Sequence, residues 1–222
     1  MKDIFTHFYH SNYWRGNESK SGTGSSLDQT QELINQLDEL FLKLNITKIL
    51  DIPCGDFNWM KHFPLREEVQ YIGGDIVEEV IESNLQNHKN SNIDFSVLDI
   101  TQDSLPDTDI IIARDCLVHF TFDYIHKTFE NLKKQNYKYI LMTSFTARPN
   151  NTDLIHVGEW RPLNMEIAPF NLPEPLKILN ENCTEENSAY NDKSMCLWSK
   201  QDFESAPCNL SHQDYFGNFI EI

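Results

Sequence analysis

The regular alternation of short apolar runs with helical patterns between residues 48 and 145 is the feature that most constrains the fold of this chain. Strands that alternate with helices in this way form a parallel sheet with helices on both faces. In such a sheet, ligands bind at the carboxyl ends of the strands, near the point where the strand order switches. The predicted strands cover residues 48–52, 69–75, 93–99, 109–114 and 137–145, and helical patterns follow the second and fourth over residues 76–87 and about 121–134.

A further helix precedes the first strand. Apolar residues recur every three or four positions over residues 27–44, which predicts one buried helical face. Ser26 and, three residues later, Gln29 are placed to form a capping box at its start.

The last third of the chain has a different pattern. Residues 146–173 are rich in proline and asparagine and predict a long ordered loop. Two final strands are expected over residues 175–181 and 193–200, joined as an antiparallel hairpin. The tail, residues 201–222, is weakly patterned and is expected at most to pack on the surface. With no internal repeat and no linker, residues 1–222 are expected to form a single domain.

Composition narrows the classes of partner. The formal net charge of −16 disfavours nucleic acid or an anionic membrane as the main partner. The chain contains no apolar run of the roughly 18 residues that a membrane span needs, and its first residues lack a signal-peptide core. Its five cysteines form no Cys-x-x-Cys pair, which fits a reducing compartment and disfavours a structural metal. A cytoplasmic protein with a small-molecule ligand is the expectation.

Three acidic residues, Asp51, Asp75 and Asp99, stand at or just past the ends of successive strands. Aspartate is common at strand ends and helix caps, so each alone has an ordinary explanation. Asp75, however, follows Asp51 at about the interval at which a ribose-binding carboxylate follows the first cofactor loop. We expect the three carboxylates to converge on one pocket.

The loop after the first strand, IPCGDF, contains a single glycine, Gly55. A dinucleotide loop uses three glycines so that the pyrophosphate can approach the backbone at a helix N-terminus, but Pro53 and Phe57 occupy two of those places here. S-adenosylmethionine has nucleoside and amino-acid parts and no phosphate, so it makes less demand on the loop. The charges of Asp51 and Asp56 also suit its cationic methionyl end better than a pyrophosphate.

Several ordered motifs resemble the class I S-adenosylmethionine-dependent methyltransferases. ILDIPCGDFNWM is similar to their first motif, YIGGDIV to the second, VLDIT to the adenine-side motif, and DIIIARDCLVHF to the segment under the transferred methyl group. Together with WRG, SGTGSSLDQT, WRPLN and PFNLPEP, they resemble a bacterial group that acts on small molecules or in surface-glycan pathways, including those that add O-methyl phosphoramidate. The resemblance covers roughly residues 12–200. It implies a Rossmann-like class I fold with a seven-stranded, mostly parallel sheet, a C-terminal antiparallel hairpin and helices on both faces.

The resemblance also implies which residues hold the cofactor. Gly55 and its neighbours would contact the methionyl part, Asp75 the ribose hydroxyls, and Asp99 with Ile100 the adenine. Because Pro53 and Phe57 depart from the general pattern, side-chain contacts are expected to matter more at that loop. The full expected cofactor set is Trp14, Ser21, Gly22, Ser25, Asp51, Cys54, Gly55, Asp56, Asp75, Ile76, Asp99, Ile100, Arg114 and Asp115.

His119 is the candidate general base. It follows the fourth strand, and an imidazole with an ordinary pKa of about 6.5 suits proton transfer at neutral pH. Asp115, four residues earlier, would orient it if that segment is helical; otherwise His119 caps or packs at a helix start and Asp115 only contacts the cofactor. A metal role for Asp123 and His126 is the weaker interpretation of an exposed helix face, and no metal site is expected.

The acceptor is expected to be small and polar. Arg15, Arg114 and Arg161 would form a clamp for an anionic or phosphorylated group, unless they pair within a chain of 34 acidic residues. Trp160 and Asn164 lie with Arg161 on the predicted loop, where Trp160 either contacts the acceptor or anchors the loop. The glycine- and serine-rich residues 1–25 form either a flexible tail or a lid in which Trp14 closes the pocket.

These observations favour the interpretation that the protein is a methyltransferase that uses S-adenosylmethionine, with oxygen as the expected acceptor atom. Two alternatives stay open: a non-catalytic protein that binds S-adenosylmethionine, and a nucleotide-dependent oxidoreductase on a similar sheet.

Overall fold

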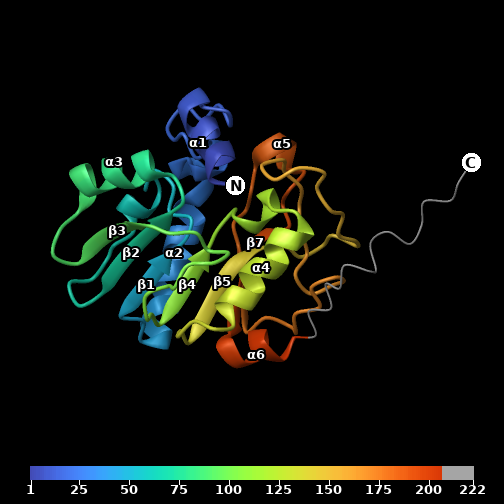
Figure 1. Ribbon diagram of the computed structural model, residues 1–222. Helices are drawn as coiled ribbons and strands as arrows, with labels where there is room; N and C mark the ends of the chain where they lie inside the picture. Colours follow the sequence, from blue (N-terminus) through green and yellow to red (C-terminus); the bar gives the residue numbers. More distant parts are fainter. Residues whose placement is uncertain (207–222) are drawn as a thin grey trace, which may run out of the picture.

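The computed structural model describes residues 1–206, and its seven strands form one sheet in the order β3-β2-β1-β4-β5-β7-β6 (Figure 1). Neighbouring strands among the first five run parallel, whereas β7 runs antiparallel to both β5 and β6. The expected mixed sheet with a C-terminal hairpin is therefore confirmed. The strands are β1 (Lys48–Asp51), β2 (Gln70–Asp75), β3 (Ile93–Val97), β4 (Ile110–Ala113), β5 (Tyr139–Phe145), β6 (Lys177–Asn180) and β7 (Lys193–Ser199).

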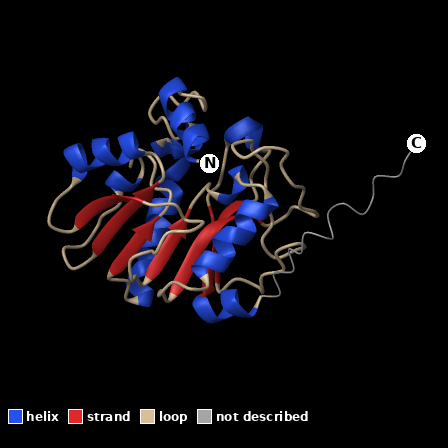
Figure 2. Cartoon of the chain, in the orientation of Figure 1, coloured by secondary structure: helices blue, strands red, loops and turns tan. Residues whose placement is uncertain are grey.

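Helices cover both faces of this sheet (Figure 2). In the view of Figure 1, α4 lies in front of the sheet and α2 behind it. The helices are α1 (Lys2–Ser11), α2 (Leu27–Leu44), α3 (Glu78–His88), α4 (Phe122–Leu132), α5 (Glu185–Ser188) and α6 (Lys200–Ser205).

Two hydrophobic clusters fill the space between the sheet and these helices. Along β4, Ile111 belongs to the cluster that contains α4, whereas its neighbours Ile110 and Ile112 belong to the one that contains α2. Alternate side chains of a strand point to opposite faces, so a strand covered on both sides must be apolar throughout. All four residues of β4 are accordingly buried.

The helix expected over residues 27–44 is confirmed, but its expected capping box is wrong. Ser26 makes no side-chain capping hydrogen bond. The side-chain amide of Gln29 instead donates to Thr184 Oγ1 at 2.6 Å, and the Leu27 backbone N–H donates to the Glu18 carboxylate at 3.0 Å. One of the free N–H groups of the first turn, that of Leu27, therefore finds an acceptor in the segment before the helix.

The N-terminal segment is ordered, and most of its first half is the helix α1, which the sequence analysis did not predict. Lys2 forms an ion pair with Glu78 at 2.5 Å, and His10 lies 3.2 Å from Glu79, so α1 is held to the start of α3. Residues of this segment line the cavity described below.

The start of the C-terminal tail differs from the expected surface segment. Residues 200–205 form the capped helix α6, and Phe203 is buried with its ring centroid 4.8 Å from that of Phe129. The tail therefore contributes to the core up to this point, and the rest of it, residues 207–222, lies outside the described residues. The long loop is confirmed, because no helix or strand lies between Phe145 and Lys177.

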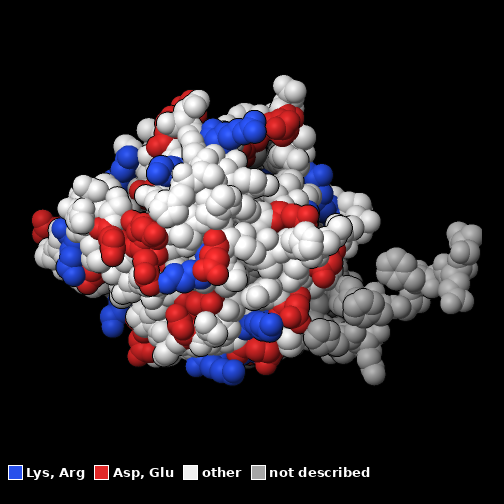
Figure 3. Space-filling model, turned by 45° about the horizontal axis from the view of Figure 1, so that its top comes forward, with Lys and Arg blue, Asp and Glu red and all other residues white. Residues whose placement is uncertain are grey.

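Charges are mixed on the face of the molecule that Figure 3 shows, with acidic and basic side chains interspersed. None of the helices within residues 1–206 is long and apolar enough to cross a membrane. Over the same residues, no group of three or more His, Cys, Asp or Glu side chains could hold a metal ion.

Candidate active site

A cavity of about 140 Å³ lies at the carboxyl ends of β1, β2 and β4, under the N-terminal segment. β1 pairs with β2 on one side and β4 on the other, so this is the switch in strand order at which α/β sheets bind ligands. The cavity is lined by loop residues that follow the strands and by side chains from α1 and the segment after it: Met1, Phe5, Tyr9, Trp14, Lys20, Ser21, Ser25, Pro53, Cys54, Gly55, Asp75, Ile76, Leu98, Asp99, Ile100, Arg114, Asp115, Cys116 and His119, among others.

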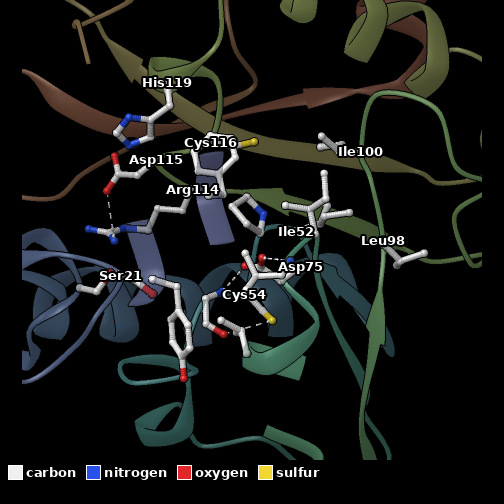
Figure 4. Close-up of a pocket in the computed structure, with 18 of the residues that line it drawn as sticks. Ser21, Ile52, Cys54, Asp75, Leu98, Ile100, Arg114, Asp115, Cys116 and His119 are labelled. Carbon is white, nitrogen blue, oxygen red and sulfur yellow. Dashed lines mark hydrogen bonds and ion pairs between the residues drawn. The ribbon is translucent and has the colours of Figure 1, made fainter. Parts of the chain in front are cut away.

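The character of the lining changes from one side of the cavity to the other. Figure 4 shows His119, Asp115 and Arg114 on one side and the apolar side chains of Leu98 and Ile100 on the other, with Asp75 between them. A ligand that spans the cavity therefore meets polar groups at one end, apolar groups at the other and a carboxylate at its middle.

Asp75 is held rigidly at the end of β2. Its carboxylate accepts hydrogen bonds from the backbone N–H groups of Val77 at 3.0 Å and Gly55 at 3.2 Å, and the residue is 7% exposed. Burial raises the pKa of Asp75 to about 6, although these backbone N–H groups act in the opposite direction. Each carboxylate oxygen still has a lone pair available, so Asp75 can accept hydrogen bonds from two hydroxyl groups.

Asp51 does not line the cavity, which corrects the expectation that three strand-end carboxylates converge there. It is 1% exposed and accepts a 2.7 Å hydrogen bond from the Tyr71 hydroxyl. Burial raises the pKa of Asp51 to about 7. The convergence holds for Asp75 and Asp99 only. Asp99 lies in the loop two residues past β3, where its carboxylate accepts hydrogen bonds from Thr101, and it lines the cavity together with Ile76 and Ile100.

The loop after β1 brings Cys54 and Gly55 to the cavity wall. Phe57 adopts a left-handed conformation with φ of 59°, and its buried ring packs against Tyr71 and Phe95. Asp56, expected to face the cofactor, is not among the lining residues. Its carboxylate accepts hydrogen bonds from Ser19 Oγ and the Lys20 N–H, each at 2.8 Å, and therefore fastens the N-terminal segment over the loop.

Aromatic side chains of the N-terminal segment form one wall of the cavity. The Phe5 ring stacks on Trp14 at 6.3 Å between centroids, and Trp14 in turn lies 5.4 Å from the ring of His119. Phe5 and Tyr9 were not singled out from the sequence. Their signal is the four-residue spacing of Met1, Phe5 and Tyr9, which places all three on one face of a helix.

His119 is oriented by a backbone carbonyl and not by Asp115. Its Nδ1 lies 3.0 Å from the carbonyl oxygen of Glu159. Because that oxygen can only accept, Nδ1 carries the proton and Nε2 has the free lone pair. Burial lowers the pKa of His119 below its usual value, so the imidazole is neutral at pH 7 and Nε2 can accept a proton.

Asp115 has a different partner from the one expected. It adopts φ of 50°, outside any helix, and its carboxylate accepts a 2.7 Å hydrogen bond from Lys193 Nζ, with the Arg114 guanidinium at 3.3 Å. Burial alone would raise the pKa of Asp115, but Lys193 and Arg114 lower it to about 2. Lys193, on β7, was not anticipated, because nothing in the sequence shows that β7 lies beside β5 and faces the β4 loop.

The predicted arginine clamp is not formed. Arg114 is buried and pairs with Glu181, with its Nη2 2.6 Å from that carboxylate and 2.8 Å from the Gly24 carbonyl oxygen. Arg161 is also buried and donates to the backbone carbonyls of Thr152, Leu117 and Phe120. The guanidinium of Arg161 therefore fixes the long loop to the turn after β4 and is outside both cavities.

Arg15 and Asn164 are also absent from both linings. Arg15 is exposed. The amide of Asn164 is buried and donates to the carbonyl oxygens of Thr146 and Arg148, so it stabilises the loop conformation.

A second cavity, of about 260 Å³, adjoins the first. Trp14, Ser21, Asp115 and His119 line both, so these four residues form the boundary between them. Trp160 lines this second cavity, with its ring centroid 4.8 Å from that of Tyr190 and 5.9 Å from that of Phe145. Other residues there include Gly22, Thr23, Gly24, Glu185, Glu186 and Lys193. Three residues that line the second cavity were missed by the sequence reasoning: Tyr190, Glu185 and Glu186, which lie in or beside the irregular helix α5.

Comparison with known proteins identifies the architecture. No protein-family model matches the sequence, and no curated protein does either. Among solved structures, the chain is similar to the magnesium protoporphyrin IX methyltransferase of Synechocystis PCC 6803 with bound S-adenosylhomocysteine, with a TM-score of 0.57 and 12% identity over 89% of this chain and 97% of that one. It is also similar to human N-acetylserotonin methyltransferase in complex with S-adenosylmethionine, with a TM-score of 0.53 and 14% identity over 88% of this chain and 58% of that one. The chain therefore has the fold of the class I S-adenosylmethionine-dependent methyltransferases.

Proposed function

We propose that this protein is a methyltransferase that uses S-adenosylmethionine to methylate a small polar acceptor. The observation that carries the proposal is the gradient across the first cavity. An apolar end formed by Leu98 and Ile100 suits the adenine, the fixed carboxylate of Asp75 suits the two ribose hydroxyls, and the polar end at His119 suits the methionyl part. The two similar structures described above were solved with S-adenosylmethionine or its product, which supports the same ligand here.

The residues at the polar end fit the remaining groups of this cofactor. Ser21 and Lys20 line the cavity and supply a hydroxyl and a cation for the methionyl carboxylate, while Cys54 and Gly55 form the wall beside them. The rings of Phe5 and Trp14 exclude water from the same end. S-adenosylmethionine supplies a methyl group on a positively charged sulfur, which is already an activated leaving group.

The protein's own contribution is then to position the acceptor and remove a proton. The acceptor enters from the second cavity and meets the methyl group at the boundary formed by Trp14, Ser21, Asp115 and His119. Methyl transfer would join the acceptor's lone pair to the methyl carbon, with the electron pair of the broken carbon–sulfur bond left on sulfur. The acceptor's proton passes to Nε2 of His119. Positioning of this kind contributes up to about 10 kcal/mol to lowering a barrier.

The finer expectation, O-methylation of a phosphorylated or phosphoramidate-bearing intermediate in surface-polysaccharide synthesis, rested on sequence motifs and on three arginines. Arg114 and Arg161 use their guanidinium groups within the protein, and Arg15 lies outside both cavities. The proposed acceptor is therefore a small polar molecule, with no phosphate group assigned to it.

Two measurements test the proposal. S-adenosylhomocysteine at 100 times its dissociation constant stabilises a protein by about 2.7 kcal/mol, so we expect a rise in melting temperature of about 5–10 °C with this ligand and none with NAD. Radiolabelled methyl transfer from S-adenosylmethionine to a panel of small polar acceptors then tests turnover. Stabilisation by NAD alone would favour an oxidoreductase, and stabilisation by S-adenosylhomocysteine without any methyl transfer would favour a non-catalytic binding protein.

A further inference from the structure

The second cavity has more acidic than basic side chains in its wall. Asp115, Glu185 and Glu186 line it, and Lys193 is the only lysine or arginine among its lining residues in the described part of the chain. An acceptor that enters this cavity therefore meets an excess of negative charge.

Three of these charged groups surround a single point beside Gly24. A Cβ atom on Gly24 would lie 3.2 Å from Glu185 Oε2 and 3.5 Å from both Asp115 Oδ2 and Lys193 Nζ. Because Asp115 also belongs to the boundary with the first cavity, the Glu185 carboxylate lies close to the position where the methyl group would be transferred.

The cations near this point already have partners. Lys193 Nζ lies 2.7 Å from Asp115 and 3.5 Å from Glu181, and Arg114 holds Glu181 at 2.6 Å. Together with Glu185, these four groups make two cations and three carboxylates, so one negative charge is in excess. It is assigned to Glu185, which accepts a 2.6 Å hydrogen bond from Thr23 Oγ1 and forms no ion pair with any basic side chain of residues 1–206.

Aromatic rings form the rest of the wall. Phe145, Trp160 and Tyr190 pack edge to face, with centroid separations from 4.8 to 6.0 Å. Such rings bury the hydrocarbon part of a ligand. The Arg148 guanidinium already lies over the faces of Phe145 and Tyr190, 5.8 and 5.5 Å from their centroids, so a cationic group of the ligand is expected to pair with the carboxylates and not with these two rings. A phosphate or carboxylate would gain nothing from these rings and would be repelled by Glu185 and Glu186.

We infer that the acceptor is a small molecule bearing an aliphatic ammonium group, which pairs with Glu185 in the second cavity while the aromatic wall contacts its hydrocarbon part. This inference rests on the proposed methyltransferase function and adds the charge class of the substrate. It also reverses the anionic acceptor that the arginine residues suggested from sequence.

Matched acceptors test this directly. D-Glucosamine and 2-aminoethanol are each compared with their N-acetyl derivatives and phosphate esters, with methyl transfer and the melting temperature of the S-adenosylhomocysteine complex as readouts. We expect KM values at least about tenfold lower for the amines than for the N-acetyl compounds. Glu185→Gln is expected to raise the KM for amines by about 10- to 100-fold, the loss of one charge-assisted hydrogen bond, with kcat and affinity for S-adenosylhomocysteine unchanged.

Two further variants separate charge from folding. Glu185→Asp keeps the carboxylate and should retain the preference for amines, and Glu39→Gln, exposed on α2, should behave as wild type. Equal use of the N-acetyl compounds, preference for the phosphate esters, or binding of S-adenosylhomocysteine with no response to any amine would overturn the inference and leave the proposed function standing. Failure to bind S-adenosylhomocysteine at all would instead remove the proposed function, and the inference with it.

Discussion

At the scale of single residues, His119 is the proposed general base. Its Nδ1 is engaged by the Glu159 carbonyl, and burial lowers its pKa, so the free Nε2 is a neutral base at physiological pH. The substitution His119→Asn removes that base, and we expect kcat to fall by about 10²- to 10³-fold. Single-turnover experiments measure the methyl-transfer step, and calorimetric titration with S-adenosylhomocysteine measures ligand binding separately. Unchanged turnover would show that His119 serves only to pack against Trp14.

Asp75 predicts a pH dependence of cofactor binding. In its ionised form the carboxylate would accept hydrogen bonds from the ribose hydroxyls of the proposed ligand, and burial raises the pKa of Asp75 to about 6. Protonation removes acceptor capacity, so affinity for S-adenosylhomocysteine should be constant above pH 7 and fall by up to about tenfold per unit below pH 6. Calorimetry between pH 5 and 8 measures this. Asp75→Asn should bind more weakly, with a flat profile over that range, and wild-type affinity that rises on acidification would contradict the role.

The buried carboxyl group of Asp51 predicts that the stability of the fold depends on pH. Burial raises its pKa to about 7 from an unfolded value near 3.9, so the folded state holds an extra proton between these values and loses stability as the pH rises from about 4 to 7. Asp51→Asn does not ionise and can still accept from Tyr71. We expect it to match wild type at pH 4 and to be more stable by about 1–3 kcal/mol at pH 8.

Urea unfolding at both pH values measures the free energies, and Asp109→Asn is the matched control. Burial alone would raise the pKa of Asp109, but hydrogen bonds from Lys138 and Thr47 lower it to about 2. Its carboxylate therefore contributes stability above the unfolded pKa, which is lost as the pH falls toward 2. Asp109→Asn should be destabilised at pH 8, and a similar loss in Asp51→Asn would show that the Asp51 carboxylate is needed in its ionised form.

At the scale of elements, the N-terminal segment forms part of the wall of the first cavity. It is tied down by Asp56, whose carboxylate accepts from Ser19, Lys20 and Ser21. Asp56→Ala removes these acceptors, so we expect faster proteolysis within residues 12–25 and a several-fold loss of affinity for S-adenosylhomocysteine. Saturating S-adenosylhomocysteine should restore protection from proteolysis.

Asp28→Ala, at an exposed position on α2, is the control for that experiment and should leave both measurements unchanged. Proteolysis of Asp56→Ala at the wild-type rate would mean that the ion pairs of α1 with Glu78 and Glu79 hold the segment without help from Asp56.

Most elements could be predicted from the sequence because periodicity and burial agree in them. The helix at residues 27–44 has one apolar face, and the apolar run of β4 is covered on both faces. α1 was missed because its Met1, Phe5 and Tyr9 face a polar-rimmed cavity and none of its residues is fully buried. α5 could not be predicted, because Glu186 and Asn187 adopt left-handed conformations that side chains disfavour.

At the scale of the whole molecule, the strand order places Asp75, Asp99 and His119 around one cavity, and those positions could be predicted from a sheet with its ligand at the strand ends. Partners could not. Asp115 pairs with Lys193 from β7, and Arg114 pairs with Glu181 just past β6, because the hairpin returns beside β5. Sequence patterns locate a residue on an element, but they do not show which distant charge neutralises it.

We propose that the first cavity holds S-adenosylmethionine with its adenine near Leu98 and Ile100 and its sulfur toward His119. A crystal structure with S-adenosylhomocysteine tests this most directly. We predict that both ribose hydroxyls lie within hydrogen-bond distance, about 2.6–3.2 Å, of Asp75 and that the sulfur faces the boundary formed by Trp14, Ser21, Asp115 and His119. A structure in which the ligand lies elsewhere, or is reversed so that the adenine contacts His119, would contradict the claim.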